Sequence, residues 1–306
     1  MRNTFVDTVI ASGSGRDDLM FISGDAGLGV FDTFREQSPR AFLNMGVAEQ
    51  NMASFAAGLA LTGCKVYLYN IIPFLLYRCY EQVRNDICYQ KLPLVLVGIG
   101  SGVTYAPAGM SHYAVEDLGI AATLPNMAVI SPCDAHEARA AAEYSLTAAE
   151  PVYIRLAKRG EAAVHNGPID DITRPVLIRD GAECAILFHG SIADEAVSAL
   201  RMLEEQGISV ALISVPMLQP LDTERLFNML TGKRLVVTLE EHFDHTGLGG
   251  LMARMVAERR PEWRLVTKGI QNRFIHEVND LAGMRKLFGL NGGQIADDIK
   301  GLLNEA

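Results

Sequence analysis

The fold of this chain is decided by residues 44–60, which read NMGVAEQNMASFAAGLA. They follow a short extended segment at 40–43 and predict a helix over roughly 46–62 that is apolar on all sides. A helix of this kind is normally buried against other structure. Glu49 and Asn51 nevertheless stand in its first turn, where the helix dipole favours a carboxylate but burial makes its charge costly. Taken alone, such residues are typical of a solvated helix N-terminus, so their interpretation depends on the whole string.

Length and composition indicate a folded protein of about two domains. Of the 306 residues, 49% are hydrophobic and 21% are charged, which is enough to bury a substantial core. The net charge of −9 is spread along the chain without basic runs, which argues against nucleic acid as the main partner. The N-terminus has no signal-peptide core, and no apolar run is long enough to span a membrane.

The cysteines are scattered, without a CxxC pair or a histidine at metal-ligand spacing. The pattern is typical of reduced, mostly buried thiols in a cytoplasmic protein. We therefore expect no metal ligands on this chain. The five residues are Cys64, Cys79, Cys88, Cys133 and Cys184.

Short apolar runs alternate with helical patterns, which is typical of parallel α/β layers. In the first part the sequence predicts strands at 19–23, 65–69, 92–98, 127–130 and 152–155, with helices near 46–62, 74–90 and 134–148. Asp134 and Glu137 form a capping-box pattern at the start of the last helix. In the second part it predicts strands at 182–188, 208–213 and 234–239, with helices at 193–206, after 250 and from about 294. We expect two α/β domains with mainly parallel sheets, at 1–160 and 182–306, joined by a glycine- and proline-containing linker at 161–181.

The string from Gly46 to Met52, preceded by Asn44, resembles the pyrimidine-binding motif of the transketolase family of thiamine diphosphate enzymes. The resemblance implies that Glu49 is catalytic and hydrogen-bonds ring nitrogen N1′ of the cofactor's aminopyrimidine. It also places Gly46 at the cofactor. A buried carboxyl group suits this role, because a low-dielectric pocket strengthens the hydrogen bond.

Two further stretches carry the resemblance to the cofactor site. Residues 73–84, PFLLYRCYEQVR, are similar to the family's aromatic stretch, which implies that Phe74 stacks on the aminopyrimidine. Arg78 is then either an anion contact at the cofactor or a simple ion-pair partner of Glu81. In SGDAGLG at 23–29, Asp25 resembles the acid that approaches the cofactor across the dimer interface.

Residues 108–118, AGMSHYAVEDL, look like the family's Asp-Gly-x-Thr-His loop. The resemblance makes His112 a catalytic residue that binds substrate oxygens or moves protons, which suits the titration range of histidine. Two departures put the usual sugar-phosphate specificity in doubt. Ala108 stands where transketolases usually have a substrate-binding Asp, and Gly100 stands where many have a substrate-binding His.

Other parts of the resemblance are less specific. Arg2 and Lys158 lie near the family's basic substrate-binding positions, although a charge of this kind is more often simply solvated. The stretches 190–191, 216–222 and 240–250 resemble the family's C-terminal domain, which supports the dimer. The glycine-rich turn at 247–250 precedes a helix, so it either holds an anion or forms a tight strand-to-helix connection.

The chain lacks the family's second module, in which Gly-Asp-Gly and a downstream Asn hold Mg²⁺ and the cofactor's diphosphate. The resemblance therefore implies a partner, an N-terminal transketolase-like subunit that carries the diphosphate-binding domain. With homodimer contacts, the expected assembly is a heterotetramer of two plus two, and the chain is expected to be inactive alone.

Three functions are compatible with these residues. The first is the C-terminal subunit of a split transketolase that transfers a two-carbon ketol unit from a ketose-type donor to an aldehyde. The second is a 1-deoxyxylulose-phosphate-synthase-like or 2-oxo acid dehydrogenase beta-type subunit that decarboxylates a 2-oxo acid. The third is a non-catalytic scaffold homologue, against which the retention of Glu49, Phe74 and His112 argues.

Overall fold

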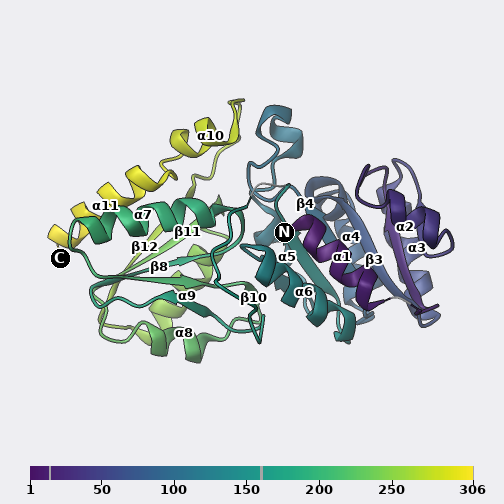
Figure 1. Ribbon diagram of the computed structural model, residues 1–306, viewed down its shortest axis with the longest axis horizontal. Coiled ribbons are helices and arrows are strands. Elements are labelled where there is room, and N and C mark those ends of the chain that lie inside the picture. The colour runs from purple at the N-terminus through teal and green to yellow at the C-terminus, as the bar shows by residue number, and fades with distance from the viewer. Residues whose placement is uncertain (14, 159–160, 306) are drawn as a thin grey trace.

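The computed structural model describes residues 1–13, 15–158 and 161–305, which form two α/β halves side by side (Figure 1). The first half contains a seven-stranded sheet and the second a five-stranded sheet. Both sheets are mainly parallel, with one antiparallel strand at an edge of each. The predicted fold class of two α/β domains is therefore confirmed.

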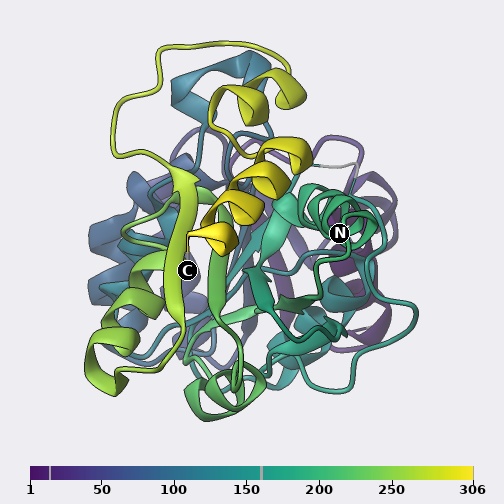
Figure 2. The same cartoon turned by 90° about the vertical axis from the view of Figure 1, so that its left-hand side faces the viewer.

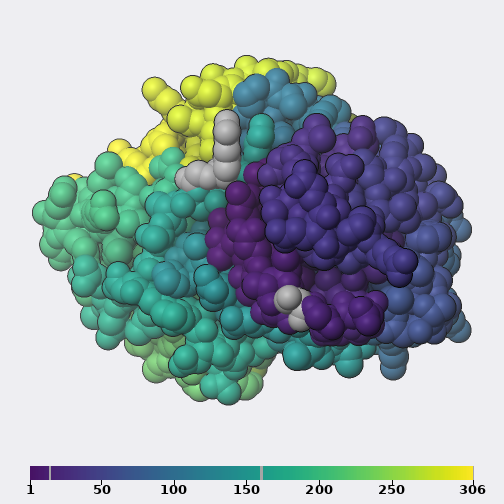
Figure 3. Space-filling view, turned by 45° about the vertical axis from the view of Figure 1, so that its right-hand side comes forward, coloured from purple at the N-terminus to yellow at the C-terminus, as the bar shows by residue number. Residues whose placement is uncertain are grey.

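The first sheet is built from strands whose side chains are mostly buried on both faces, as expected for parallel strands covered by helices. In spatial order its strands are β10 (Met217–Gln219), β5 (Ala128–Ile130), β6 (Val152–Leu156), β4 (Val95–Ile99), β3 (Lys65–Ile71), β1 (Leu19–Ser23) and β2 (Phe42–Asn44). One face packs against α1 (Arg2–Ser12), α2 (Asp32–Gln37) and α6 (Ala135–Thr147). The other packs against α3 (Glu49–Leu61), α4 (Tyr80–Gln82) and α5 (Asp117–Ala122). In Figure 3 the purple N-terminal residues lie beside teal ones, as the packing of α1 on α6 requires.

The second sheet has the strand order β12 (Arg264–Ile270), β11 (Leu235–Phe243), β8 (Cys184–Phe188), β9 (Val210–Ser214) and β7 (Val176–Arg179). Its outer face packs against α7 (Ala193–Glu205), α10 (Leu281–Leu287) and α11 (Gly292–Asn304). Its other face packs against α8 (Thr223–Met229) and α9 (Leu248–Arg259). The apolar cluster on this face continues into the first half, so the two halves share one core.

The chain crosses between the halves at two further places. Strand β10 comes from the second half in sequence but pairs with β5 of the first sheet. Residues 271–280 arch over the top of the molecule to the segment 103–113 (Figure 2). There the Tyr113 hydroxyl donates to the carbonyl of Glu277 at 3.1 Å.

Several local predictions differ from the structure. The helix expected at 74–90 is wrong as a single α-helix, because π-helical turns at Pro73–Tyr77 and Val83–Cys88 flank the short α4. The expected linker contains strand β7, and its expected boundary at residue 160 lies outside the described residues. Helix α1 was not predicted from the sequence. The cap of α6 is confirmed, with Asp134 accepting the N–H groups of His136 and Glu137.

Four of the five cysteines are buried and Cys64 is half-buried, as the sequence predicts. Across the described part of the chain, no helix is long and apolar enough to cross a membrane.

Candidate active site

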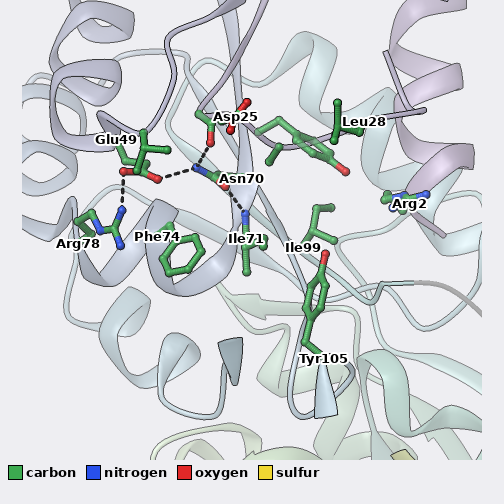
Figure 4. Close-up of a pocket in the computed structure, with 15 residues that line it drawn as sticks. Arg2, Asp25, Leu28, Glu49, Asn70, Ile71, Phe74, Arg78, Ile99 and Tyr105 are labelled. Carbon is green, nitrogen blue, oxygen red and sulfur yellow. Dashed lines mark hydrogen bonds and ion pairs between the residues drawn. The ribbon is translucent and has the colours of Figure 1, made fainter. Parts of the chain in front are cut away.

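A cavity of about 360 Å³ opens at the carboxyl ends of three neighbouring strands of the first sheet. Gly24 to Leu28 follow β1, Asn70 and Ile71 end β3, and Ile99 ends β4. The carboxyl edge of an open α/β sheet is where ligands normally bind. Figure 4 shows Glu49, Arg78 and Phe74 at one end of the cavity and Arg2 and Leu28 at the other.

Glu49 is the first residue of α3, and only 3% of its surface is exposed. No side chain caps this helix, so the Glu49 carboxylate lies where the positive end of the helix dipole favours it. Its Oε2 accepts a hydrogen bond from Arg78 Nη1 at 2.6 Å, and its Oε1 accepts one from Asn70 Nδ2 at 3.4 Å. The longer contact leaves Oε1 free to accept a stronger donor from the cavity.

Asn70 fixes the position of Glu49 and was not predicted from the sequence. Its Nδ2 also donates to the carbonyl of Gly24 at 3.2 Å, and its Oδ1 accepts the N–H of Ile71 at 2.8 Å. A Cβ on Gly24 would lie 2.6 Å from Asn70 Nδ2 and 3.2 Å from Glu49 Cγ, so this contact requires glycine. The available signal was a polar residue at the carboxyl end of a buried strand.

Phe74 and Arg78 come from the π-helical turn after β3 and the residue that follows it. The Arg78 guanidinium lies 4.6 Å from the centre of the Phe74 ring, a cation–π contact. Arg78 pairs with Glu49 at 2.6 Å, so the simple pairing with Glu81 considered from the sequence is wrong. The Arg78 side chain is 42% exposed, so the ion pair reaches solvent through the cavity mouth.

His112 lies beside the cavity at the end of a short 3₁₀ turn. Its ring meets Phe74 edge-on at 5.4 Å and Tyr105 at 5.8 Å, while its Nδ1 lies 2.9 Å from Ser111 Oγ. Histidine, phenylalanine and tyrosine from separate segments thus form one aromatic wall.

Tyr105 explains why glycine stands at position 100, where a histidine was expected from the resemblance. A Cβ on Gly100 would lie 2.2 Å from the Tyr105 ring, and Gly100 has a φ of +93°, which disfavours other residues. Tyr105 therefore fills the space that a side chain at position 100 would need. The Lys158 ammonium lies 4.5 Å from the centre of the same ring. Nothing in the sequence motif indicated this role for Tyr105.

The remaining predicted residues separate into two groups. Arg2 and Asp25 line the cavity together with Glu49, Phe74 and Arg78. Gly46 instead shapes the turn before α3. Its φ is +70°, and its N–H donates to Asn44 Oδ1 at 2.9 Å.

The same Asn44 oxygen accepts the N–H of Asp25 at 3.1 Å, so Asn44 connects the turn before α3 to the loop after β1. Two tyrosines add hydroxyl donors to the cavity lining. Burial raises the pKa of Tyr69 and of Tyr105, so both hydroxyls stay protonated at neutral pH.

Comparison with known proteins agrees with this geometry. Residues 1–160 match the family described as "Transketolase, pyrimidine binding domain", and residues 175–294 match "Transketolase, C-terminal domain". The chain is 32% identical to a subunit of the apulose-4-phosphate transketolase of Actinobacillus succinogenes, over 97% of this chain and 96% of that one. It is 30% identical to the 1-deoxy-D-xylulose-5-phosphate synthase of Caldanaerobacter subterraneus subsp. tengcongensis, over 87% of this chain and 43% of that one. A solved structure described as "Split gene transketolase, inactive beta4 tetramer" is similar over 99% of this chain and 97% of that one, with a TM-score of 0.87 and 29% identity.

Proposed function

Because this chain belongs to the transketolase family, we propose that it is the C-terminal subunit of a two-chain, thiamine diphosphate-dependent ketol transferase. It transfers a two-carbon unit from a ketose-type donor to an aldehyde acceptor. The observation that carries the proposal is the buried carboxylate of Glu49, held at the edge of a cavity whose wall includes Phe74.

The residues present fit the aminopyrimidine half of the cofactor. Glu49 offers an acceptor oxygen, Oε1, whose only hydrogen bond from a described residue is the long 3.4 Å bond from Asn70. Phe74 offers an aromatic surface, and glycine at position 24 brings the backbone close to both polar groups. When bound, thiamine diphosphate supplies the carbon nucleophile that holds the transferred two-carbon unit.

Each residue of this chain has a distinct part in the proposal. Glu49 holds a proton between its carboxylate and the pyrimidine ring, and Arg78 positions that carboxylate. Phe74 fixes the orientation of the ring. His112 binds substrate oxygens or moves a proton at them, since its ring borders the same aromatic wall. Asp25 approaches the cofactor from the loop after β1, and Gly46 shapes the turn that presents Glu49.

The chain carries no Gly-Asp-Gly module, so Mg²⁺ and the diphosphate are assigned to a partner subunit. The proposed assembly is a heterotetramer with two copies of each chain, and it keeps the cytoplasmic location that the sequence predicts. Similarity over nearly the whole length of a protein named as a transketolase subunit supports the division into two chains. The related structure described as an inactive β4 tetramer supports self-association of this type of chain without its partner.

We assign the substrates to compounds with an anionic end. Arg2 lies at the end of the cavity away from Glu49 (Figure 4). The Lys158 ammonium lies over the ring of Tyr105, which lines the same cavity. Two cations near the end of the cavity away from Glu49 suit a phosphate or another acidic group on the substrate. The A. succinogenes relative is named for a phosphorylated sugar, which agrees with this assignment.

A second candidate function is decarboxylation of a 2-oxo acid, as a 1-deoxyxylulose-phosphate-synthase-like or 2-oxo acid dehydrogenase beta-type subunit. The similarity to a 1-deoxy-D-xylulose-5-phosphate synthase and the alanine at position 108 favour it. The scaffold alternative is disfavoured, because Glu49, Phe74 and His112 lie together at one site.

The decisive assay uses the chain reconstituted with its partner subunit, thiamine diphosphate and Mg²⁺. We expect ketol transfer from phosphorylated ketoses to aldehydes and no release of CO₂ from pyruvate. Pyruvate decarboxylation without ketol transfer would replace the proposal by the second candidate. Absence of both activities would favour the non-catalytic scaffold homologue.

A further inference from the structure

A second group of reactive side chains lies away from the cavity, where the segment after residue 161 meets the start of α6. The Cys133 sulfur, a Glu137 carboxylate oxygen and a His165 ring nitrogen lie within 4.8 Å of one another. The Glu137 side chain is fully buried, and the His165 side chain is 6% exposed. This group was not predicted from the sequence, because His165 is distant from Cys133 in the chain.

The His165 ring is held by a single carboxylate. Asp134 Oδ2 lies 3.0 Å from His165 Nδ1, and it also accepts the backbone N–H groups of Val164 and His165, each at 2.9 Å. A carboxylate at Nδ1 favours the tautomer that carries its hydrogen there. The lone pair of Nε2 then points away from Asp134 into the group.

His165 Nε2 has no hydrogen-bond partner among the described residues, and it lies 3.4 Å from Glu137 Oε1. In this tautomer a nitrogen lone pair faces a carboxylate oxygen in a buried place, which is unfavourable unless positive charge lies between them. A proton on Nε2 is one possible occupant, and a metal ion is the other.

The thiol of Cys133 favours the metal. Ser214, at the end of β9, donates to Glu137 Oε1 at 2.6 Å, and its Oγ lies 3.7 Å from Cys133 Sγ. Glu137 Oε2 accepts the backbone N–H of Cys133 at 2.7 Å, which holds the carboxylate beside that residue. A protonated histidine needs no sulfur beside it, whereas a divalent transition metal uses sulfur, nitrogen and oxygen together.

We propose that Cys133 Sγ, Glu137 and His165 Nε2 form a binding site for zinc or a similar divalent transition metal. Thiolate and imidazole ligands select such ions over Mg²⁺, which requires oxygen ligands. Zinc binds these ligand atoms at about 2.0–2.3 Å in a tetrahedron, which leaves a fourth position for Ser214 or water. Asp134 holds the second nitrogen of His165, as carboxylates do for metal-binding histidines.

The ion would join three parts of the molecule: the loop between β5 and α6, the segment after residue 161, and, through Ser214, strand β9 of the second sheet. Its role is therefore structural. Binding replaces the proton of the Cys133 thiol, so the affinity for the ion increases with pH. The site is separate from the Mg²⁺ that the proposed function assigns to the partner subunit, and it does not depend on that function.

The first test is a titration of the full-length, untagged, metal-free chain with Co²⁺ alone. We expect saturation at one equivalent, with an intense near-ultraviolet band from the cobalt–thiolate bond and visible bands of tetrahedral Co²⁺. One equivalent of Zn²⁺ should remove the bands, and Mg²⁺ in excess should not. Absence of a thiolate band after one equivalent of Co²⁺ overturns the proposal, without any variant being needed.

Two matched pairs of variants then assign the ligands. Cys133→Ser and His165→Gln should bind Co²⁺ at least tenfold more weakly, and Cys133→Ser should lose the thiolate band. Cys184→Ser, which changes another buried thiol, and His136→Gln, which changes a nearby histidine, should bind as the unchanged chain does. If Cys133→Ser retains the band, or if the control variants lose it equally, the assigned ligands are wrong.

A thermal melt covers the case in which a ligand variant folds poorly. A metal that binds only the folded chain raises its Tm with concentration. Zn²⁺ should raise the Tm of the unchanged chain and of both controls. An unchanged Tm at saturating Zn²⁺ would contradict a structural metal site.

Discussion

The carboxyl edge of the first sheet is open and that of the second is filled, although both sheets are mainly parallel α/β layers. In the first sheet this edge opens into the cavity that holds Glu49 and Phe74. In the second sheet it is filled by buried charged and polar side chains at the ends of β8 and β11: His189, Glu240, Glu241 and His242. We call these four residues the polar plug. The difference indicates where chemistry is expected, because the described residues leave a large cavity at the first edge and fill the second with side chains.

The polar plug is satisfied from both halves of the molecule. Glu240 accepts the N–H groups of Leu248 and Gly249 at 2.9 and 2.8 Å, so an internal carboxylate occupies the start of α9. The anion considered for this glycine-rich turn is therefore part of the chain itself. Burial alone would raise the pKa of Glu240, but His189, His242 and the N–H of Gly249 hold it below its ordinary value.

Arg155 joins the plug to the first sheet. Its Nε donates to Asp117 Oδ2 at 2.8 Å, and its Nη2 donates to the backbone carbonyls of Ala114 and Glu241 at 2.9 and 3.1 Å. The hydrogen bond to Glu241 thus connects the second half to the buried Arg155–Asp117 ion pair of the first half. The same types of residue serve structure at one edge and, in our proposal, catalysis at the other.

The largest expected effect is at Glu49, where catalysis should change and stability should not. Glu49→Gln keeps the shape of the side chain but cannot hold the proton at the pyrimidine ring. We expect kcat/KM of the reconstituted enzyme to fall about 10²–10⁴-fold, with assembly and Tm unchanged. Full activity in this variant would contradict the catalytic role proposed for Glu49 at the open edge.

The matching change is Arg155→Met, at the residue that joins the plug to the first sheet, and it leaves the Asp117 carboxylate buried without its cation. Breaking a buried pair from one side costs about 3–5 kcal/mol. We expect the free energy of unfolding to fall by that amount in urea titrations. A free energy of unfolding equal to that of the unchanged chain would contradict the structural role that we assign to the filled edge.

Gly24→Ala tests how tightly the open edge is packed. The added methyl group would meet Asn70 Nδ2 at 2.6 Å, and relieving such overpacking costs about 1–3 kcal/mol. We expect weaker binding of thiamine diphosphate to the assembled enzyme, measured by calorimetry. Gly58→Ala on α3 is the control, because nothing lies within 4 Å of its added Cβ. Equal cofactor affinity in both variants would contradict the proposed contact.

A smaller effect is expected at the substrate end of the cavity. Lys158→Ala removes a cation beside Tyr105 without touching Glu49 or Phe74. We expect KM for phosphorylated donors to rise about tenfold, which is about 1.4 kcal/mol, with kcat almost unchanged. If KM rises equally for an uncharged donor, the side chain does not bind the anionic group.

The smallest expected effect is the contribution of His242, in the plug, to the pH dependence of stability. Burial lowers the pKa of His242 below its ordinary 6.5, and Nε2 of its ring accepts the N–H of Leu118 at 3.1 Å. The groups that face it are Asp117, Glu240 and Arg155.

Below about pH 6.5 the unfolded chain binds a proton at His242 that the folded chain does not, so stability is lost as the pH falls. We expect urea midpoints to be lower at about pH 6 than at about pH 8, with a smaller difference in His242→Gln. An equal pH dependence in the variant would assign the effect to other groups.

The sequence predicted the fold class and most of the open edge, because a run of specific residues such as 44–52 implies both a helix and its neighbours. Periodicity also predicted the central strands of both sheets, but not the edge strands β10, β12 and β7. It did not predict the π-helical turns after β3, since tertiary packing decides which ladder of hydrogen bonds a helix uses.

Residues whose contacts are distant in the sequence were harder to predict. Asn70, Tyr105 and the polar plug come from strand ends and loops whose neighbours are far away in the sequence. The ion pair between Arg78 and Glu49 was missed for the same reason, because Glu81 is nearer to Arg78 along the chain. Sequence motifs identified the chemical groups, but the fold was needed to show which of them contact one another.

The central claim is that this chain works with a partner that completes its open edge. The most direct test is native mass spectrometry of the protein purified gently from its source organism. We predict a complex of two copies of this chain and two of another, with masses for thiamine diphosphate and Mg²⁺. A homo-oligomer that binds no cofactor after both are added, and gains none from any co-purified chain, would contradict the claim.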